Sequence, residues 1–227
     1  MKIEFPHINN FPKQISLLKD SERLRLSVSR MKTLQENKNI VIHTHSFIPN
    51  NDVDFGKATF EIESHIERLI KEFVYSNDNN KLIEIFHYIQ FWGGITGRNI
   101  YVKNGGFENN FSLGAYKAII EIATNINQET RKADLKKVEL LSKQIKNIGI
   151  SFTTKHLSFW TRFTNKHHFI LPVLDSTLSL NLMYKCNPTW NDYRHYVEQM
   201  HKEASVNNTT VTILERELYN YFNNNKK

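Results

Sequence analysis

Apolar residues recur every three or four positions along most of the chain, which is the spacing of amphipathic helices. The predicted helices cover residues 22–35, 59–75, 81–91, 111–127, 130–147, 190–205 and 209–222. Ile40-Val41-Ile42 is a short β-branched run that fits a strand or an extended segment. The pattern predicts a mainly α protein with about nine or ten helices and little or no sheet.

The stretch from Ser151 to Leu182 reads as a helix, a return loop and a second helix. Thr153 and Thr154 are N-cap residue types directly before an apolar run, and Asp175 precedes the second run, Leu178, Leu180 and Leu182. Lys155 therefore stands at the start of one helix and Asp175 at the start of the next. If the loop returns fully, both side chains reach the same end of the helix pair and face one cleft.

A lysine amine and a carboxylate that face one space form a recognisable chemical pair. A desolvated amine loses its proton and becomes a nucleophile for an electrophilic carbon. The carboxylate can orient that carbon or stabilise positive charge that develops on it. The alternative interpretation is a surface lysine at a helix start and an ordinary N-cap.

The segment GISFTTKHL (149–157), followed by LPVLD (171–175), resembles the hairpin, lysine and aspartate of helix-hairpin-helix DNA glycosylases. The resemblance covers residues 82–182 and points to the 8-oxoguanine glycosylase branch, in particular its small bacterial members, some of which act against phages with modified DNA. It implies a fold of two helical lobes flanking a cleft, with the helix at 130–147 as the first of the motif. The family hairpin has Gly-x-Gly before the lysine, whereas Ser151-Phe152-Thr153 replaces the second glycine here.

The resemblance implies a DNA N-glycosylase that flips a damaged or modified base out of the duplex and cleaves its glycosidic bond. Lys155 matches the lysine that attacks C1′ and forms a Schiff base, and Asp175 matches the aspartate that steers the attack. The substrate stays open between 8-oxoguanine and a modified cytosine, such as glucosylated hydroxymethylcytosine. The biological role also stays open between base excision repair and phage defence. The reaction stays open between simple excision and excision with AP-lyase strand cleavage.

Residues around this pair are candidates for the base pocket and for DNA contacts. Trp92, Phe159 and Trp160 are predicted pocket walls, with ordinary core positions as the alternative. Arg98 follows a glycine-rich stretch and would meet a phosphate or fill the gap that an extruded base leaves. The remaining predicted DNA-binding residues lie in and beside the hairpin: Lys143, Lys146, Gly149, Ser151, Thr153 and His156.

Composition changes the interpretation only modestly. The net charge of +7, from 30 basic and 23 acidic residues, fits a polyanionic partner, here double-stranded DNA. A single cysteine, Cys186, excludes an internal disulfide and suits a reducing compartment. With no long apolar run and no signal-peptide pattern, we expect a soluble, cytoplasmic monomer that does not contact membranes.

The turn-rich residues Pro49–Asp54 suggest a boundary between an N-terminal segment, 1–58, that packs on the core and a glycosylase-like domain, 59–227. We expect no cofactor and no catalytic metal; His43 and His45 are paired for a metal on a strand but lack a third ligand. A monovalent cation at the hairpin is the one ion that the resemblance suggests. Two other functions stay open: a non-catalytic helix-hairpin-helix DNA-binding protein and a helical module that binds a protein.

Overall fold

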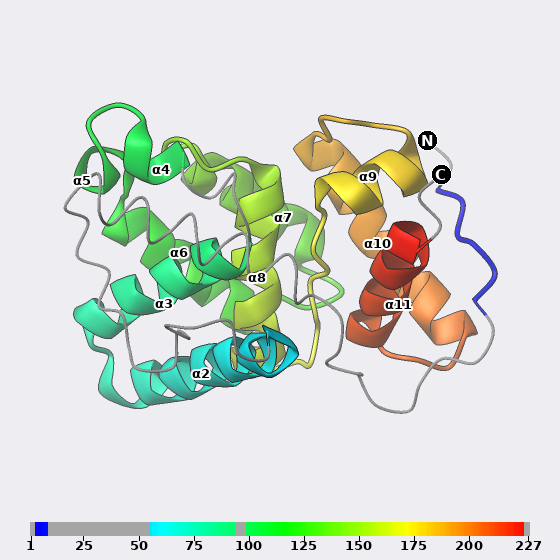
Figure 1. Ribbon diagram of the computed structural model, residues 1–227, viewed down its shortest axis with the longest axis horizontal. Helices are drawn as coiled ribbons and strands as arrows, with labels where there is room; N and C mark the ends of the chain where they lie inside the picture. The colour runs from blue at the N-terminus through cyan, green and yellow to red at the C-terminus, as the bar shows by residue number, and fades with distance from the viewer. Residues whose placement is uncertain (1–2, 9–54, 94–98, 225–227) are drawn as a thin grey trace. The chain divides into compact units, whose positions relative to one another are not determined.

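The computed structural model describes residues 3–8, 55–93 and 99–224, and these ranges contain ten helices and no strand (Figure 1). The mainly α class predicted from the sequence is confirmed. The chain divides into two compact units, the first formed by Met1–Ser16 with Gly114–Lys227 and the second by Leu17–Leu113. Most of the predicted N-terminal segment, including the helix at 22–35 and the pair His43 and His45, lies outside the described residues.

The described part of the second unit is built on a helical hairpin. Its helices are α2 (Phe55–Ser76), α3 (Asn79–Trp92), α4 (Asn99–Val102) and α5 (Phe107–Asn110). The predicted apolar stripes meet where α2 packs on α3, and their side chains are buried: Ile66, Leu69, Ile70, Phe73, Leu82, Ile85, Phe86 and Ile89. Asn77 ends α2 in the left-handed conformation, with φ 54°, which an asparagine tolerates better than most residues.

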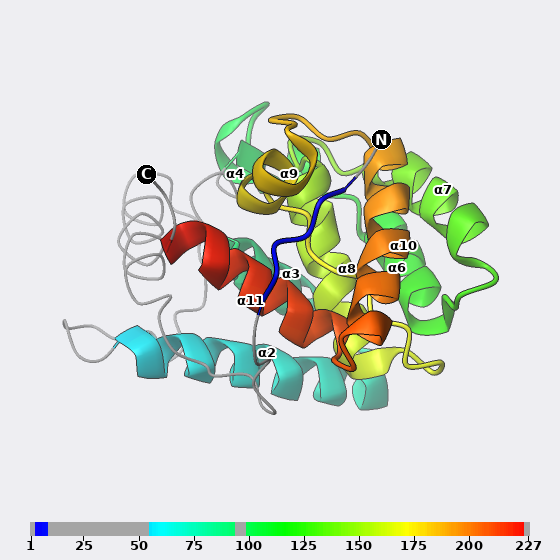
Figure 2. The same cartoon turned by 90° about the vertical axis from the view of Figure 1, so that its right-hand side faces the viewer.

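The first unit holds the six remaining helices. They are α6 (Leu113–Asn125), α7 (Arg131–Ser142), α8 (Ile150–Thr164), α9 (Ser176–Met183), α10 (Trp190–Val206) and α11 (Val211–Asn224). Figures 1 and 2 both show α11 beside α9 and α10, which it contacts. Among the residues that the structure describes, no helix combines the length and apolar character needed to cross a membrane.

The connection between α7 and α8 departs from the prediction. The helix predicted to run to residue 147 ends at Ser142, where the amides of Gln144 and Ile145 bond carbonyls three residues back and tighten the last turn. Ile145 is buried even so, which is why the apolar period continued past the end of the helix. Asn147, with φ 62°, then turns the chain into α8.

The predicted start of α8 at Thr153 and Thr154 was wrong. Gly149 is the N-cap residue, and the two threonine hydroxyls donate to the carbonyls of Gly149 and Ser151 inside the first turns. Lys155 consequently lies in the second turn of α8. A threonine is as compatible with such a back-bond to its own helix as with an N-cap, so residue type alone did not separate the two.

The helix α8 forms the centre of its unit and is buried from Phe152 to Thr161. Its polar side chains are satisfied inside: the Tyr116 hydroxyl of α6 lies 2.8 Å from His156 Nδ1, and Trp160 Nε1 donates to that hydroxyl over 3.0 Å. Burial, and then the charge of Lys155, lower the pKa of His156 to about 3. The imidazole is therefore a neutral member of a buried hydrogen-bond network.

We expect Tyr116→Phe to destabilise the protein by about 1–3 kcal/mol, because it removes the hydrogen bonds of this buried hydroxyl with His156 and Trp160 while it preserves the ring. Urea unfolding followed by circular dichroism measures the change. Tyr184→Phe is the matched control, since Tyr184 is 77% exposed, and it should leave the free energy of unfolding unchanged. Equal stability of the two variants would show that the network contributes nothing.

Candidate active site

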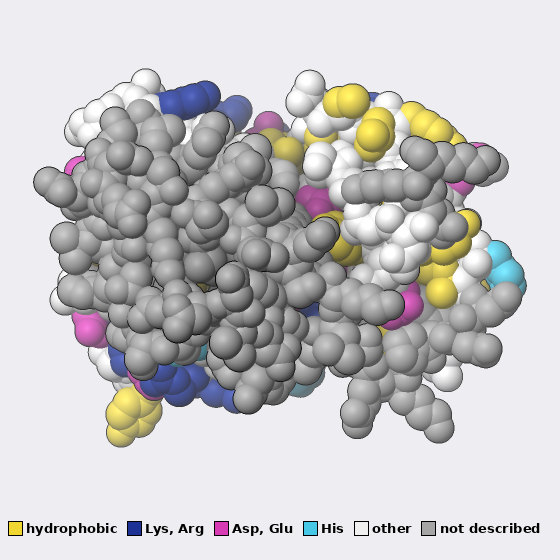
Figure 3. All heavy atoms as spheres, viewed as in Figure 1, with side chains coloured by type: hydrophobic (Ala, Val, Ile, Leu, Met, Phe, Trp, Pro, Cys, Tyr) yellow, Lys and Arg dark blue, Asp and Glu magenta, His cyan; other side chains and the backbone are white. Residues whose placement is uncertain are grey.

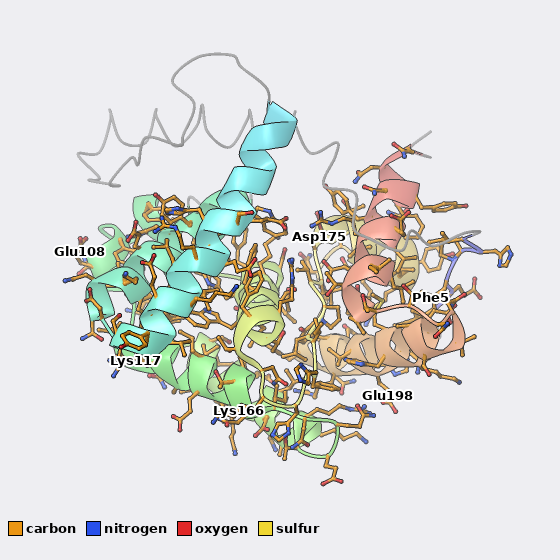
Figure 4. All side chains as sticks on the ribbon, turned by 90° about the horizontal axis from the view of Figure 1, so that it is seen from below. Phe5, Glu108, Lys117, Lys166, Asp175 and Glu198 are labelled. Atoms are coloured by element: carbon orange, nitrogen blue, oxygen red, sulfur yellow. The ribbon has the colours of Figure 1, made fainter. Side chains whose placement is uncertain are left out.

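The segment between α8 and α9 runs back along α8, as Figure 1 shows for the yellow connection. The Leu171 amide donates to Thr161 Oγ1 over 3.0 Å, and the Leu174 amide donates to Thr154 Oγ1 over 3.1 Å. Figure 4 places Lys166 and Asp175 at opposite ends of this segment. The full return expected from the sequence is therefore present, and it joins the direct chain neighbours of Lys155 and Asp175 by a hydrogen bond.

Asp175 is the N-cap residue of α9, as the sequence predicted. Its backbone is extended, and its Oδ1 accepts the Leu178 amide over 2.9 Å. An N-cap carboxylate satisfies an amide that has no partner within the helix and favours the positive end of the helix dipole. The side chain is buried where the return loop ends and α9 begins, so its surroundings restrict its orientation.

Lys155 is an unusual residue for its place, because its side chain is only 2% exposed. The amine donates to Ser151 Oγ, 3.0 Å away and one turn earlier in α8, and lies 4.6 Å from the centroid of the Phe152 ring. No acidic residue lies in the first turn of α8. The lysine is therefore held in one direction near the start of the helix instead of extending into solvent.

Side chains from three helices hold the loop that leads to Asp175. Besides the two threonines of α8, Glu215 of α11 accepts the Val173 amide at Oε2 over 2.6 Å. Tyr193 of α10 donates its hydroxyl to the Pro172 carbonyl over 2.9 Å. Sequence reasoning missed Glu215 and Tyr193, because they lie in helices far along the chain and no local pattern marks them.

These side chains form an acidic and phenolic cluster with Asp175. The pKa of Glu215 is raised to about 7, mainly by burial and to a smaller extent by Asp175, whereas the Val173 amide, Arg162 and Arg216 oppose the rise. Burial also raises the pKa values of two phenols of α10, Tyr193 and Tyr196, and Glu215 raises both further. Tyr196 is wholly buried, and its hydroxyl makes no hydrogen bond within the described residues.

The raised pKa of Glu215 predicts a pH-dependent stability. The folded protein retains this proton up to about pH 7, whereas the unfolded chain loses it near the ordinary glutamate pKa of 4.5, so stability falls as pH rises between the two. Glu215→Gln cannot ionise and should be more stable than the wild type above pH 7 by about 2 kcal/mol, allowing for the partly exposed side chain. Urea unfolding from pH 4.5 to 8 tests this, with Glu217→Gln as the control on the same helix. Parallel curves for the wild type and the Glu215 variant would contradict it.

The three predicted pocket walls lie in two different units. Phe159 and Trp160 are 1% and 0% exposed in the first unit, so they are ordinary core residues, as the alternative interpretation held. Neither ring has a face open to a base. Trp92 lies at the end of α3 in the second unit, half-buried, with Nε1 donating to Glu63 Oε1 over 3.1 Å. Arg98 lies outside the described residues.

The predicted DNA-binding residues of the hairpin separate into an exposed and a buried group. Lys143, Lys146 and Gly149 are exposed between α7 and α8, and the Lys143 amine lies 3.9 Å from Glu139. Thr153 and His156 are buried in α8, so the structure does not present them to a phosphate. Ser151 is half-buried and bonds Lys155.

A separate open cavity of about 560 Å³ lies on α7 and α10 and contains neither Lys155 nor Asp175. Its lining is mostly charged: Lys132, Lys136, Asn191, Asp192, Arg194, His195 and Glu198. Elsewhere, α9 exposes Leu180, a member of the apolar run that the sequence showed after Asp175, and hydrophobic side chains show on the surface over α9 in Figure 3. Within the described ranges, no three potential ligands gather to hold a metal ion.

The chain matches a known protein family. Residues 66–219, more than half of the chain, match the family model described as "Putative 8-oxoguanine DNA glycosylase OGG-like protein". The match spans parts of both units and includes the hairpin, Lys155, Asp175 and Glu215. Neither the curated proteins nor the solved structures contain a match.

Proposed function

The chain belongs to the OGG-like DNA glycosylase family, and on this premise we propose that it excises a damaged or modified base from duplex DNA with Lys155 and Asp175 as catalytic residues. The observation that carries the proposal is the return loop. It joins Thr154 to Leu174, and so brings a buried lysine and a buried N-cap aspartate to the same end of α8. A surface lysine and an ordinary cap would not require this arrangement.

The chemistry assigns each side chain a step. The flipped nucleotide presents C1′, and the Lys155 amine, once it has lost its proton, attacks it as the bond to the base breaks, with the base leaving as an anion that takes up a proton. The carboxylate of Asp175 stabilises the positive charge that develops on the sugar. The nitrogen now bonded to C1′ loses a proton, and the C1′–O4′ bond then breaks with O4′ taking up a proton, which gives a Schiff base from which elimination can cleave the strand.

The exposed hairpin supplies the contact to the DNA backbone in this proposal. Amides at the start of a helix lack partners within it and favour a phosphate oxygen. Lys143 and Lys146 add positive charge beside this start. The DNA backbone is therefore held close to the start of α8, the helix that carries Lys155.

Gly149 offers a direct test of the hairpin. An added Cβ would meet nothing within 4 Å, and φ is −87°, so the fold itself does not require glycine. We expect Gly149→Ala to change stability by less than about 1 kcal/mol but to weaken duplex binding several-fold, because the methyl group blocks the approach of a phosphate. Fluorescence anisotropy with a labelled duplex measures the affinity. Gly114→Ala is the matched control, because the position is equally open and lies in α6.

The proposed function is tested with the full chain and a panel of duplexes that carry 8-oxoguanine, hydroxymethylcytosine, glucosylated hydroxymethylcytosine, uracil or an undamaged base. Excision is scored by alkaline cleavage at the resulting abasic site, and lyase activity by cleavage without alkali. We expect excision from at least one modified duplex and none from the undamaged one. Salt-sensitive binding without excision of any base would support the non-catalytic DNA-binding alternative instead.

A further inference from the structure

The loop before Asp175 has a side-chain contact that the family resemblance does not assign. Glu215 Oε2 accepts the Val173 amide over 2.6 Å, across 42 positions of the chain. Asp175 follows Val173 by two residues, and the Leu174 amide between them is held by Thr154. The backbone that leads to the proposed catalytic carboxylate is therefore held from α11 on one side and from α8 on the other.

We propose that Glu215 is a positioning residue of the glycosylase site, which holds Val173 so that the Asp175 carboxylate keeps its direction. The proposal rests on the function proposed above and deepens it. Hydrogen bonds from side chains of neighbouring helices can fix the backbone of a loop that belongs to no helix or sheet. A displacement of about 1 Å at a reacting group can lower the reaction rate by a large factor.

The surroundings of Glu215 argue against an incidental acid on α11. Two basic side chains, Arg162 of α8 and Arg216 of α11, favour its ionised form, whereas Asp175 and the phenols Tyr193 and Tyr196 of α10 surround it with acidic groups. Burial beside another carboxylate raises its pKa, so the chain carries a group whose charge is costly at this place. The hydrogen bond to Val173 is what the fold gains from it.

Three variants of the full chain separate positioning from general stability. Glu215→Gln keeps an oxygen acceptor for the Val173 amide, Glu215→Ala removes it, and Glu217→Ala is the control on the same helix. We expect Glu215→Ala to lower the single-turnover excision rate by about 10- to 100-fold, with the duplex Kd within about twofold of the wild type. The excision rate of Glu215→Gln should stay within about threefold of the wild-type rate at pH 6. If ionisation of Glu215 changes the wild-type rate between pH 6 and 8, that change should be missing in Glu215→Gln.

Two kinetic results would overturn the proposal: a wild-type rate for Glu215→Ala, or an equal loss in the Gln and Ala variants. A second measurement does not depend on activity. Hydrogen exchange should be faster at the Val173 and Leu178 amides in Glu215→Ala than in Glu217→Ala, because both amides depend on the held loop. If the wild type excises nothing, the proposed function fails, but exchange still decides whether Glu215 holds the loop; unchanged exchange rejects that too.

Discussion

Replacing Lys155 by alanine is expected to abolish the borohydride-trapped adduct between the protein and a duplex that carries an abasic site or an excisable base. The adduct requires a primary amine at C1′, and the structure provides one that is buried and held in direction by Ser151. We expect trapping and strand cleavage to fall by at least about 100-fold. Gel separation of the cross-linked species, with a labelled duplex, measures this.

Two further variants make the result specific. Lys155→Gln keeps much of the side-chain length without a nucleophilic amine and should be as inactive as Lys155→Ala. Lys202→Ala removes an exposed amine from α10 and should trap like the wild type. A full adduct yield from Lys155→Ala would assign the Schiff base to another amine and contradict the proposed role.

The absence of any adduct in a wild-type protein that still excises a base would have a different meaning. The amine would then not attack C1′, and Asp175 would support the attack of a water molecule instead. Excision would persist in Lys155→Gln, since the acid is unchanged. The pair of assays therefore distinguishes simple excision from excision with lyase activity, a choice that the sequence left open.

The sequence predicted those parts of the site that depend on neighbouring residues. The N-cap role of Asp175 in α9 was predictable, because an aspartate directly before an apolar run has few other local roles. The apolar period placed most helices to within a few residues. It failed at Ser142, because buried Ile145 continued the period into a turn that is no longer helical.

The environment of α8 could not be predicted in the same way. A helix that is buried on all sides has no polar face, so the sequence SFTTKHLSFW gives no sign that His156 points inward. His156 was placed at the DNA because it follows Lys155 and is basic. Its partner is Tyr116, 40 residues earlier, and only the packing of α6 on α8 brings them together.

The support of Asp175 also depends on distant residues. Glu215 reaches the loop from α11, the last described helix, where the sequence showed only an amphipathic run. A carboxylate in such a run is normally exposed to solvent. The pKa of Glu215 lies near 7 because the residue is buried, which no local pattern in the sequence reveals. The chemical pair was thus predictable from local pattern and family resemblance, whereas the side chains that hold it required the fold.

Replacing Asp175 by asparagine is expected to separate the structural role of this residue from its catalytic role. Asparagine is as good an N-cap as aspartate, and its Oδ1 can accept the Leu178 amide in the same way. We therefore expect Asp175→Asn to unfold within about 0.5 kcal/mol of the wild type. The excision rate should nevertheless fall by about 10²–10³-fold, because the neutral amide no longer stabilises positive charge on the sugar.

Asp175→Ala should lose activity and stability together, since it removes the cap, at a cost of about 1 kcal/mol, as well as the charge. Asp134→Asn, at a half-buried position in the first turn of α7, controls for the loss of a carboxylate and should match the wild type in rate. Single-turnover excision and urea unfolding of the same preparations give both quantities. If Asp175→Asn excises at the wild-type rate, the acid is only a helix cap, and the proposed pair of catalytic residues is wrong. If it is inactive but as stable as the wild type, the negative charge at the start of α9 serves the reaction, because the fold has been shown not to need it.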